Sequence, residues 1–241
     1  MIRFFASRSD ISDNMIRLSA EDAEHIRSLR LRPSEVFTVC DGMGFDYVCR
    51  LGARGETGVA EIIETYPSRG EPSVVCSVYI AFAKGDRLEY AVQKSVELGA
   101  HDIVLFPSER CVSVPGEKNK KTARLQRIAM ETAKQCGRGR IPAVTAAESF
   151  AAAVERASRA GLPLFLYECE DRTSIKQALE RYADGQTISV VTGPEGGFEP
   201  YEAEAARSSG MITVTFGPRI LRCETAPAAA LAAVMFHTNN F

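Results

Sequence analysis

Two glycine-bearing segments near the C-terminus contain the residues best suited to hold a ligand. The first, TGPEGGF at 192–198, places glycines on both sides of a rigid proline, so a ligand could lie directly against the backbone. The second, FGPRILRCETA at 216–226, adds Arg219, Arg222 and Glu224, which supply charge of both signs. Two simpler interpretations stay open: a tight strand-to-helix turn for the first segment, and ion pairs that close a loop for the second.

The elements around these segments predict where they lie. Both follow apolar runs, TISVVT and MITVTF, that are typical of buried strands. The second precedes AAALAAVMF, which is apolar on nearly every face and predicts a buried helix or an oligomer contact, with Thr225 or Ala226 as its cap and Pro227 in its first turn. The start of such a helix offers free backbone N–H groups to an anionic or carbonyl group.

From Val74 onward, apolar runs alternate with helical patterns. The runs are VVCSVYIAFA, DIVLF, LFLYE and TISVVTG, and the predicted helices cover 86–98, about 117–136 and about 174–183. This alternation predicts an α/β domain built on a mostly parallel sheet. Because ligands bind beyond the carboxyl ends of such strands, we expect the two glycine segments to share one pocket.

The first 66 residues have a different texture. Short strand patterns (IRFF, MIRL, EVFTVC, DYVCRL and GVAEII) surround one helix between Arg17 and Pro33, where Ser19 followed by Asp22 predicts the N-terminal cap. The segment PSRGEPS at 67–73 reads as a linker. We therefore predict a small β-rich domain at 1–70 and the α/β domain at 71–241.

Charge is concentrated in one segment, although the whole chain carries a net charge of only −2. Residues 110–140 hold 9 basic and 2 acidic residues, a local excess of +7. Such a segment is a candidate polyanion contact, and a solvated helix face is the alternative.

Composition excludes several classes of protein. An apolar share of 45% fits a globular chain, and no run approaches the roughly 18 apolar residues of a membrane span. The start MIRFFASRSD lacks the layout of a secretion signal, so we expect a cytoplasmic protein without a membrane partner. The seven cysteines show no CxxC spacing and the three histidines no ligand spacing, which predicts reduced thiols and no metal site.

Common catalytic motifs are also missing. GPEGGF is not the dinucleotide pattern GxGxxG, and the chain has no P-loop lysine motif, no serine nucleophile elbow and no HExxH helix. Any ligand in the predicted pocket is therefore expected to be held largely by backbone groups.

TGPEGGF and FGPRILRCETA closely resemble the two C-terminal motifs of the SPOUT methyltransferases, specifically the RsmE family. The similarity extends through KGDRLEYAVQKSVELG (84–99), SER (108–110) and KQCGRGRIP (134–142), and covers essentially the whole chain. Departures are small: Lys134 and Phe216 stand where relatives often have Glu and Leu. The resemblance implies a C-terminal SPOUT-type trefoil-knot domain and a small N-terminal β-barrel, PUA-like RNA-binding domain, in a homodimer.

The resemblance also implies an activity: transfer of a methyl group from S-adenosyl-L-methionine to N3 of a uridine in 16S rRNA, uridine 1498 by family resemblance, on free rRNA or the 30S subunit. The implied cofactor-binding residues are Leu166, Thr192, Gly193, Glu195, Gly196, Gly197, Phe216, Gly217, Ile220, Leu221, Arg222, Thr225 and Ala226. The predicted catalytic residues are Arg222, Glu224 and Arg219.

Two catalytic devices are open at this point. Glu224 could remove the weakly acidic N3 proton, or Arg222 and Arg219 could stabilise negative charge on the uracil carbonyl oxygens. We favour the arginines, because a carboxylate beside an arginine usually has a lowered pKa and is a poorer base. The predicted RNA-binding residues are Arg27, Arg30, Arg32, Arg110, Lys118, Lys120, Lys121, Arg124, Arg138 and Arg140.

Two other functions remain as alternatives. A non-catalytic RNA-binding protein with the same fold would not respond to S-adenosylmethionine. An enzyme of small phosphorylated metabolites would use the glycine segments as a phosphate cradle, which the missing phosphate-loop lysine disfavours.

Overall fold

The computed structural model describes residues 3–32, 34–52, 58–112 and 118–241; the side chain of Lys118 also lies outside the description. The chain divides into two compact units. The first comprises Met1–Glu71 and Ala133–Ile141, and the second comprises Pro72–Thr132 and Pro142–Phe241.

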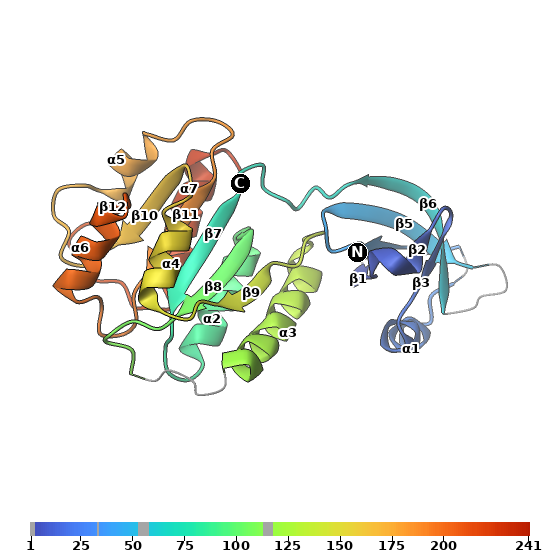
Figure 1. Ribbon diagram of the computed structural model, residues 1–241. Coiled ribbons are helices and arrows are strands. Elements are labelled where there is room, and N and C mark those ends of the chain that lie inside the picture. The colour runs from blue at the N-terminus through green and yellow to red at the C-terminus, as the bar shows by residue number, and fades with distance from the viewer. Residues whose placement is uncertain (1–2, 33, 53–57, 113–117) are drawn as a thin grey trace. The chain divides into compact units, whose positions relative to one another are not determined.

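The first unit is built on a six-stranded sheet with the order β1-β4-β5-β6-β3-β2 (Figure 1). Its strands are β1 (Arg3–Phe5), β2 (Ile11–Ser12), β3 (Met15–Arg17), β4 (Val36–Cys40), β5 (Phe45–Leu51) and β6 (Val59–Pro67). Apart from the parallel pair β1–β4, neighbouring strands are antiparallel. Phe4, Ile16, Phe37 and Val39 are buried in its core.

The helix α1 (Ala20–Leu29) begins where the sequence predicted. Ser19 is its N-cap, and the Ser19 hydroxyl oxygen accepts a hydrogen bond from the Asp22 backbone N–H at 3.0 Å. Such a cap satisfies one of the N–H groups that a helix start leaves without a partner. Ile26 carries the apolar face of α1 into the core, which fixes the helix against the sheet.

The second unit is built on a six-stranded sheet with the order β12-β10-β11-β7-β8-β9. Its strands are β7 (Cys76–Ala81), β8 (Asp102–Phe106), β9 (Ala143–Ala146), β10 (Leu162–Leu166), β11 (Ile188–Thr192) and β12 (Ile212–Val214). Every neighbouring pair is parallel, so the predicted parallel sheet is confirmed. Because the strands are parallel, the carboxyl ends of β10, β11, β12 and β7 lie at the same edge of the sheet. The strand order changes direction at β7, with β8 and β9 on one side of it and β11, β10 and β12 on the other.

Helices cover both faces of this sheet. On one face lie α4 (Phe150–Ala157) and α6 (Pro200–Ser208), and on the other lie α2 (Arg87–Glu97), α5 (Ile175–Leu179) and α7 (Ala226–His237) (Figure 1). The helix α3 (Lys118–Cys136) turns Leu125, Ala129 and Ala133 inward, which confirms its predicted apolar face. Thr225 is the N-cap of α7 and Pro227 stands in its first turn, as predicted.

The structure differs from the prediction in four places. The short strands β2 and β9 and the helix α4 were not foreseen, because β2 has only two residues and α4 is rich in alanine, which gives weak periodicity. The segment Ala133–Ile141 was assigned by sequence to the second domain, but it packs in the first unit. There the carboxylate of Glu71 accepts hydrogen bonds from the backbone N–H groups of Gly139 and Arg140, each at 3.0 Å.

Candidate functional site

A cavity of about 830 Å³ lies at the carboxyl ends of β10, β11 and β12 in the second unit. Its walls come from the loops after these strands: residues 167–171, residues 193–197 and residues 215–224. The two glycine segments therefore share one pocket, as the sequence predicted. Volumes of 300–1,000 Å³ are typical of pockets for small molecules and cofactors.

Most of the predicted site residues line this cavity. They are Leu166, Gly193, Glu195, Gly196, Gly197, Phe216, Gly217, Arg219, Ile220, Leu221, Arg222, Glu224 and Ala226. Thr192 and Thr225 are not among the lining residues. The Thr192 side chain is buried and its hydroxyl donates to the Tyr79 carbonyl at 3.2 Å, which is a structural role, and Thr225 is the cap of α7.

Glu195 is an acidic side chain of the cavity with one oxygen held by the protein and one without a partner among the described residues. Its Oε1 atom accepts hydrogen bonds from the Lys84 backbone N–H at 2.8 Å and from Arg87 Nη1 at 3.1 Å. Its Oε2 atom is buried and has no hydrogen-bond partner among the described residues. A buried acceptor without a donor costs free energy, so Oε2 is suited to receive a donor from a ligand.

The three glycines of the first glycine segment have no room for a side chain, because other protein atoms occupy the space that a Cβ atom would need. Gly197 has φ +69°, and a Cβ atom there would overlap the Glu168 carboxylate. At Gly193 a Cβ atom would meet the Phe198 ring at 3.0 Å, and at Gly196 it would meet Arg110 at 2.9 Å. Glycine is therefore required here for close approach as well as for conformation.

Arg110 and Glu202 fasten this segment from outside. Arg110 Nε donates to Glu199 Oε1 at 2.7 Å, and Arg110 Nη1 donates to the Gly196 carbonyl at 3.0 Å. The buried carboxylate of Glu202 accepts hydrogen bonds from the Ser108 hydroxyl and the Glu109 and Glu199 backbone N–H groups. Arg110, which was predicted to bind RNA, therefore also has a structural role, because it holds the first glycine segment next to α6.

Glu224 is held as a carboxylate. Burial opposes ionisation, but hydrogen bonds from its own backbone N–H and from the Cys223 thiol, together with the charges of Arg87 and Arg222, hold its pKa below the usual value. Burial, the hydrogen bond to Glu224 and the neighbouring charges raise the pKa of Cys223 to about 12. Cys223 is therefore a protonated donor, and Glu224 is a weak base.

Glu170 holds the loop after β10. Its Oε2 atom accepts hydrogen bonds from the Thr213 hydroxyl and from Arg207 Nη2, and its Oε1 atom accepts one from the Arg172 backbone N–H at 2.9 Å. Burial would raise the pKa of Glu170, but these hydrogen bonds dominate and lower it to about 2. The carboxylate therefore ties the cavity wall to β12.

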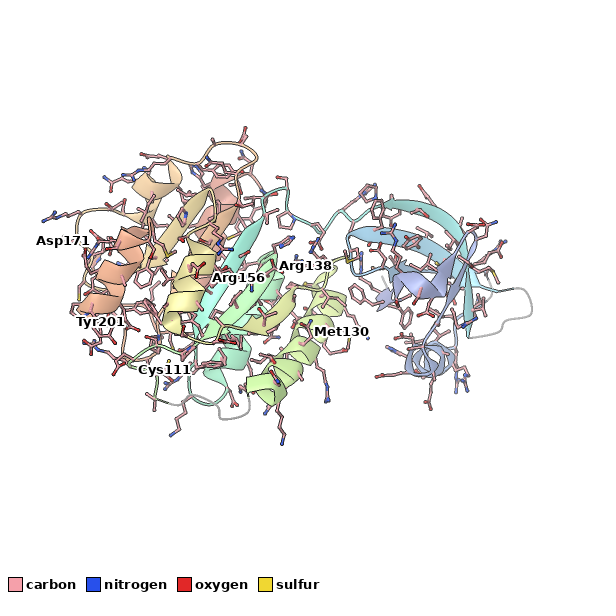
Figure 2. The ribbon with its side chains drawn as sticks, viewed as in Figure 1. Cys111, Met130, Arg138, Arg156, Asp171 and Tyr201 are labelled. Atoms are coloured by element: carbon pink, nitrogen blue, oxygen red, sulfur yellow. The ribbon has the colours of Figure 1, made fainter. Side chains whose placement is uncertain are left out.

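Sequence reasoning missed part of the cavity. The missed lining residues are Arg87, Tyr167, Glu168, Cys169, Glu170, Asp171, Pro194, Val214, Thr215, Pro218 and Cys223. The rule that ligands bind beyond strand ends, applied to LFLYE as well, would have found 167–171. Figure 2 shows the side chain of Asp171 in this loop, where it is 90% exposed.

The predicted RNA-binding cations have different surroundings. Arg27, Arg30 and Arg32 are exposed at and after the end of α1. Lys121 and Arg124 both pair with Glu89 of α2, at 3.4 and 2.9 Å. Lys120 is exposed and Arg140 half-buried. The side chain of Lys118, also predicted to bind RNA, lies outside the described residues.

Arg138, which was also predicted to bind RNA, is held in an ion pair within the first unit. Its side chain, labelled in Figure 2, is only 3% exposed, and its Nη2 atom lies 2.7 Å from Glu71 Oε2. Burial beside a carboxylate makes Arg138 a structural residue of the first unit.

Two broader properties follow from the described residues. Among them, no cluster of His, Cys, Asp and Glu has the arrangement of a metal site. Among the residues that the structure describes, no helix is both long and apolar enough to cross a membrane.

With the cavity described, comparisons with known proteins define the class. A family model described as an RNA methyltransferase domain matches residues 70–235, and one described as an RNA methyltransferase PUA domain matches residues 18–64. The fold is therefore that of an RNA methyltransferase with an N-terminal PUA domain.

Individual relatives narrow this class. The ribosomal RNA small subunit methyltransferase E of Bacillus subtilis (strain 168) is 30% identical over 230 residues, which cover 92% of this chain and 90% of the relative. The crystal structure of the Neisseria gonorrhoeae ribosomal RNA small subunit methyltransferase E bound to S-adenosyl methionine is 30% identical, with a TM-score of 0.81 over 98% of this chain and 97% of that one. The chain belongs to the ribosomal RNA small subunit methyltransferase E family, which confirms the resemblance found in the sequence.

A second solved structure has the same fold. A methyltransferase from Legionella pneumophila, in complex with the bound cofactor SAM, is 26% identical with a TM-score of 0.81, covering 98% of this chain and 97% of that one.

Proposed function

We propose that this protein transfers a methyl group from S-adenosyl-L-methionine to N3 of a uridine in 16S rRNA of the small ribosomal subunit, position 1498 by family resemblance. The observation that carries this proposal is the single cavity formed by the two glycine segments, in which backbone and charged groups converge. Relatives from Neisseria gonorrhoeae and Legionella pneumophila, with TM-scores of 0.81, have structures with the same donor bound.

The residues of the cavity fit this donor. The buried, unpartnered Oε2 atom of Glu195 is suited to a cationic or N–H donor group, and the donor molecule carries both an ammonium group and a sulfonium. The glycines at 193, 196 and 197 line the cavity, and the absence of side chains there leaves room for Phe198, Arg110 and Glu168 to pack against this segment. When bound, S-adenosylmethionine would supply an electrophilic methyl group that needs no further activation.

The chain's own residues would then act on the uracil. N3 loses its weakly acidic proton to solvent water as it gains the methyl group, and this loss is helped by groups that stabilise negative charge as it develops on the neighbouring carbonyl oxygens. Arg219 and Arg222 line the cavity and are exposed, so their guanidinium groups are accessible to a base that enters from solvent. We assign this stabilisation to Arg222, with Arg219 beside it.

Glu224 is better suited to positioning than to proton removal. Its lowered pKa makes it a poor proton acceptor, and its Oε2 atom already accepts a hydrogen bond from the Cys223 thiol, with an S···O distance of 3.2 Å. The N3 atom lies on the Watson-Crick edge, so the target base must be unpaired or extruded to reach these residues. Orientation would supply much of the remaining rate.

Cations on α1 and α3 would hold the RNA through its phosphates. Arg27, Arg30 and Arg32 lie at one end of α1, and Lys120, Lys121 and Arg124 lie along α3. Binding through phosphates releases counterions, so RNA affinity should fall steeply with salt. Charge reversal at Lys120, Lys121 and Arg124 should weaken RNA binding and flatten this dependence without altering affinity for S-adenosylmethionine.

We also propose that the protein is a homodimer and that its C-terminal segment forms a trefoil knot. Support for the dimer comes from large apolar side chains that α2, α7 and the second glycine segment leave exposed: Tyr90 at 49%, Phe236 at 78% and Ile220 at 83%. Exposed apolar surface of this kind commonly marks an interface. Light scattering after size exclusion tests the dimer, and a monomer at micromolar concentration would refute it.

Incubation with labelled S-adenosylmethionine and undermodified 16S RNA or 30S particles tests the main proposal. The expected result is one labelled uridine, methylated at N3. RNA binding without a thermal shift by S-adenosylmethionine would instead support a non-catalytic RNA-binding protein. Stabilisation by phosphorylated metabolites with no competition from RNA would support a metabolic enzyme.

A further inference from the structure

The turn between β4 and β5, residues 41–44, forms a small apolar tip on the first unit together with Phe45, the first residue of β5, and these five residues are here called the β4–β5 tip. Met43 is 58% exposed and Phe45 is 46% exposed, although both side chains are large and apolar. Single exposed apolar residues are common, but two on one short turn call for an explanation.

The β4–β5 tip is internally fixed. The Oδ1 atom of Asp41 accepts hydrogen bonds from the backbone N–H groups of Met43 at 2.8 Å and Phe45 at 3.1 Å. Gly42 and Gly44 have φ values of +71° and +108°, which side chains other than glycine rarely adopt. The Asp41 backbone N–H closes the turn by donating to the Phe45 carbonyl at 3.2 Å.

Two neighbouring segments of the same unit brace the tip. The Ser68 backbone N–H donates to the Gly44 carbonyl at 2.8 Å, and the Ile141 backbone N–H donates to the Gly42 carbonyl at 3.4 Å. Arg140 forms bridge pairings with Gly42 and Met43. The tip is therefore a preorganised surface that keeps Met43 and Phe45 in water, and a ligand that binds there would meet little loss of conformational entropy.

The charge around the tip is positive once existing pairs are counted. Asp46 pairs with Arg3 at 2.8 Å and Glu71 pairs with Arg138 at 2.7 Å, whereas the Asp41 carboxylate keeps its single negative charge while it accepts hydrogen bonds from the two backbone N–H groups. Arg69 directly follows the bracing residue Ser68 and is exposed, and Arg140 is half-buried. Within the described residues, neither of these two guanidinium groups has an ion-pair partner.

We propose that the β4–β5 tip, with Arg69 and Arg140, binds an unpaired segment of RNA. Phe45 and Met43 offer apolar surface to the faces of unstacked bases, and the two guanidinium groups offer charge to the adjacent phosphates. The matched RNA methyltransferase PUA model covers residues 18–64 and so includes the tip. This inference rests on the proposed function, and it adds a second contact that lies outside the methyl-transfer cavity.

The double variant Met43→Ala/Phe45→Ala tests the proposal, with Ile63→Ala on β6 as the matched control, because Ile63 is 53% exposed but lies outside the turn. Binding is measured to a hairpin RNA with an unpaired loop and to a fully paired duplex. Stacking of one base on an aromatic side chain is worth about 1–3 kcal/mol, so the double variant should lose roughly 5- to 150-fold in affinity for the loop RNA. Duplex affinity and affinity for S-adenosylmethionine should stay within about twofold, as for the Ile63→Ala variant.

Each outcome has a defined meaning. Unchanged loop affinity in the double variant, with circular dichroism that reports a native fold, overturns the tip as an RNA contact. A changed oligomeric state with unchanged RNA affinity overturns it in favour of a protein contact. If the wild-type protein binds loop RNA through the tip but methylates no ribosomal RNA, the proposed function fails and the tip stands.

Discussion

The carboxylate of Glu168 occupies the space where a side chain at residue 197 would begin, so Gly197 and Glu168 are fitted to each other. Glu168 Oε1 accepts a hydrogen bond from the Phe198 backbone N–H at 3.0 Å, which holds the glycine segment against the loop after β10. A Cβ atom at Gly197 would overlap this carboxylate, and the φ of +69° already disfavours any side chain. Gly197→Ala should therefore displace Glu168 and narrow the cavity.

We expect the Gly197→Ala variant to bind S-adenosylmethionine at least about tenfold more weakly, measured by isothermal titration calorimetry, a loss of roughly 1.4 kcal/mol. Gly210→Ala is the matched control, because Gly210 has φ +87° but a Cβ atom there would meet no atom within 4 Å. Both variants should lose about 1 kcal/mol of folding free energy from the left-handed backbone. Equal cofactor affinity in the two variants would contradict the fitted contact.

Glu195→Gln tests whether the unpartnered Oε2 atom receives a donor from the ligand. The amide keeps the shape and can still accept from the Lys84 backbone N–H, but it loses the negative charge beside Arg87. Hydrogen bonds to charged groups are worth about 1.5–3 kcal/mol, so the Kd for S-adenosylmethionine should rise roughly 10- to 100-fold. Glu204→Gln is the control, because the Glu204 side chain on α6 is 70% exposed, and it should leave the Kd for S-adenosylmethionine unchanged. A Kd equal to wild type in both variants would show that Glu195 only fastens the loop.

Arg222→Ala and Glu224→Gln separate the two catalytic devices. Loss of one group that stabilises developing charge typically costs about 10²–10³ in rate, so Arg222→Ala should lower single-turnover methylation by that factor. Arg222→Lys should recover part of it. Glu224→Gln should slow the reaction by less than about tenfold and keep the pH profile, since a carboxylate with a lowered pKa is a poor base. A flattened profile in Glu224→Gln would identify Glu224 as the base instead.

The positions of the site residues could be predicted because they follow short apolar runs in a parallel sheet. The strand at 102–106 and the cap at Ser19 were predictable to the residue, since local pattern and side-chain chemistry determine them. The burial of Arg138 was not predictable from the sequence, because it depends on Glu71, a residue far away in the chain that faces the same segment. Charge density indicated a cationic segment but could not distinguish cations that face solvent from one that holds the first unit together.

The same limit applies to the cavity. Cys223 and Arg222, which help to lower the pKa of Glu224, are its neighbours in sequence, but Arg87 acts on it from α2. Glu195 likewise meets Lys84 and Arg87, which lie more than 100 residues away in the chain, so its surroundings could not be predicted from the sequence. The loop at 167–171 has no glycine pattern to attract notice. It enters the site because β10 lies between β11 and β12 in the sheet, an order that no local sequence signal contains.

Glu170 should make the free energy of unfolding depend on pH in the acidic range. Its pKa is lowered from 4.5 to about 2, so the folded state favours the carboxylate, and this contribution is complete above pH 4.5 and is lost as the pH falls towards 2. In urea titrations, wild type should lose stability across this window more steeply than Glu170→Gln. Asp171→Asn is the control, because Asp171 is 90% exposed and its closest ion pair, with Arg172, spans 4.0 Å. Parallel curves for wild type and Glu170→Gln would contradict the assignment.

Arg30 combines a strained backbone with a position suited to RNA, and two substitutions can separate these properties. As the C-cap of α1 it has φ +51° and ψ +41°, a left-handed conformation that glycine adopts without the steric cost of a Cβ atom. Arg30→Gly should therefore raise the free energy of unfolding by about 0.5–1 kcal/mol, whereas Arg30→Ala, which keeps the strain, should not. Both remove the same charge, so both should weaken RNA binding and reduce the slope of log affinity against log salt by about one if Arg30 contacts a phosphate. If Arg30→Gly raises the free energy of unfolding but neither variant changes the salt slope, the backbone strain at Arg30 is confirmed. Arg30 is then not part of the RNA-binding surface.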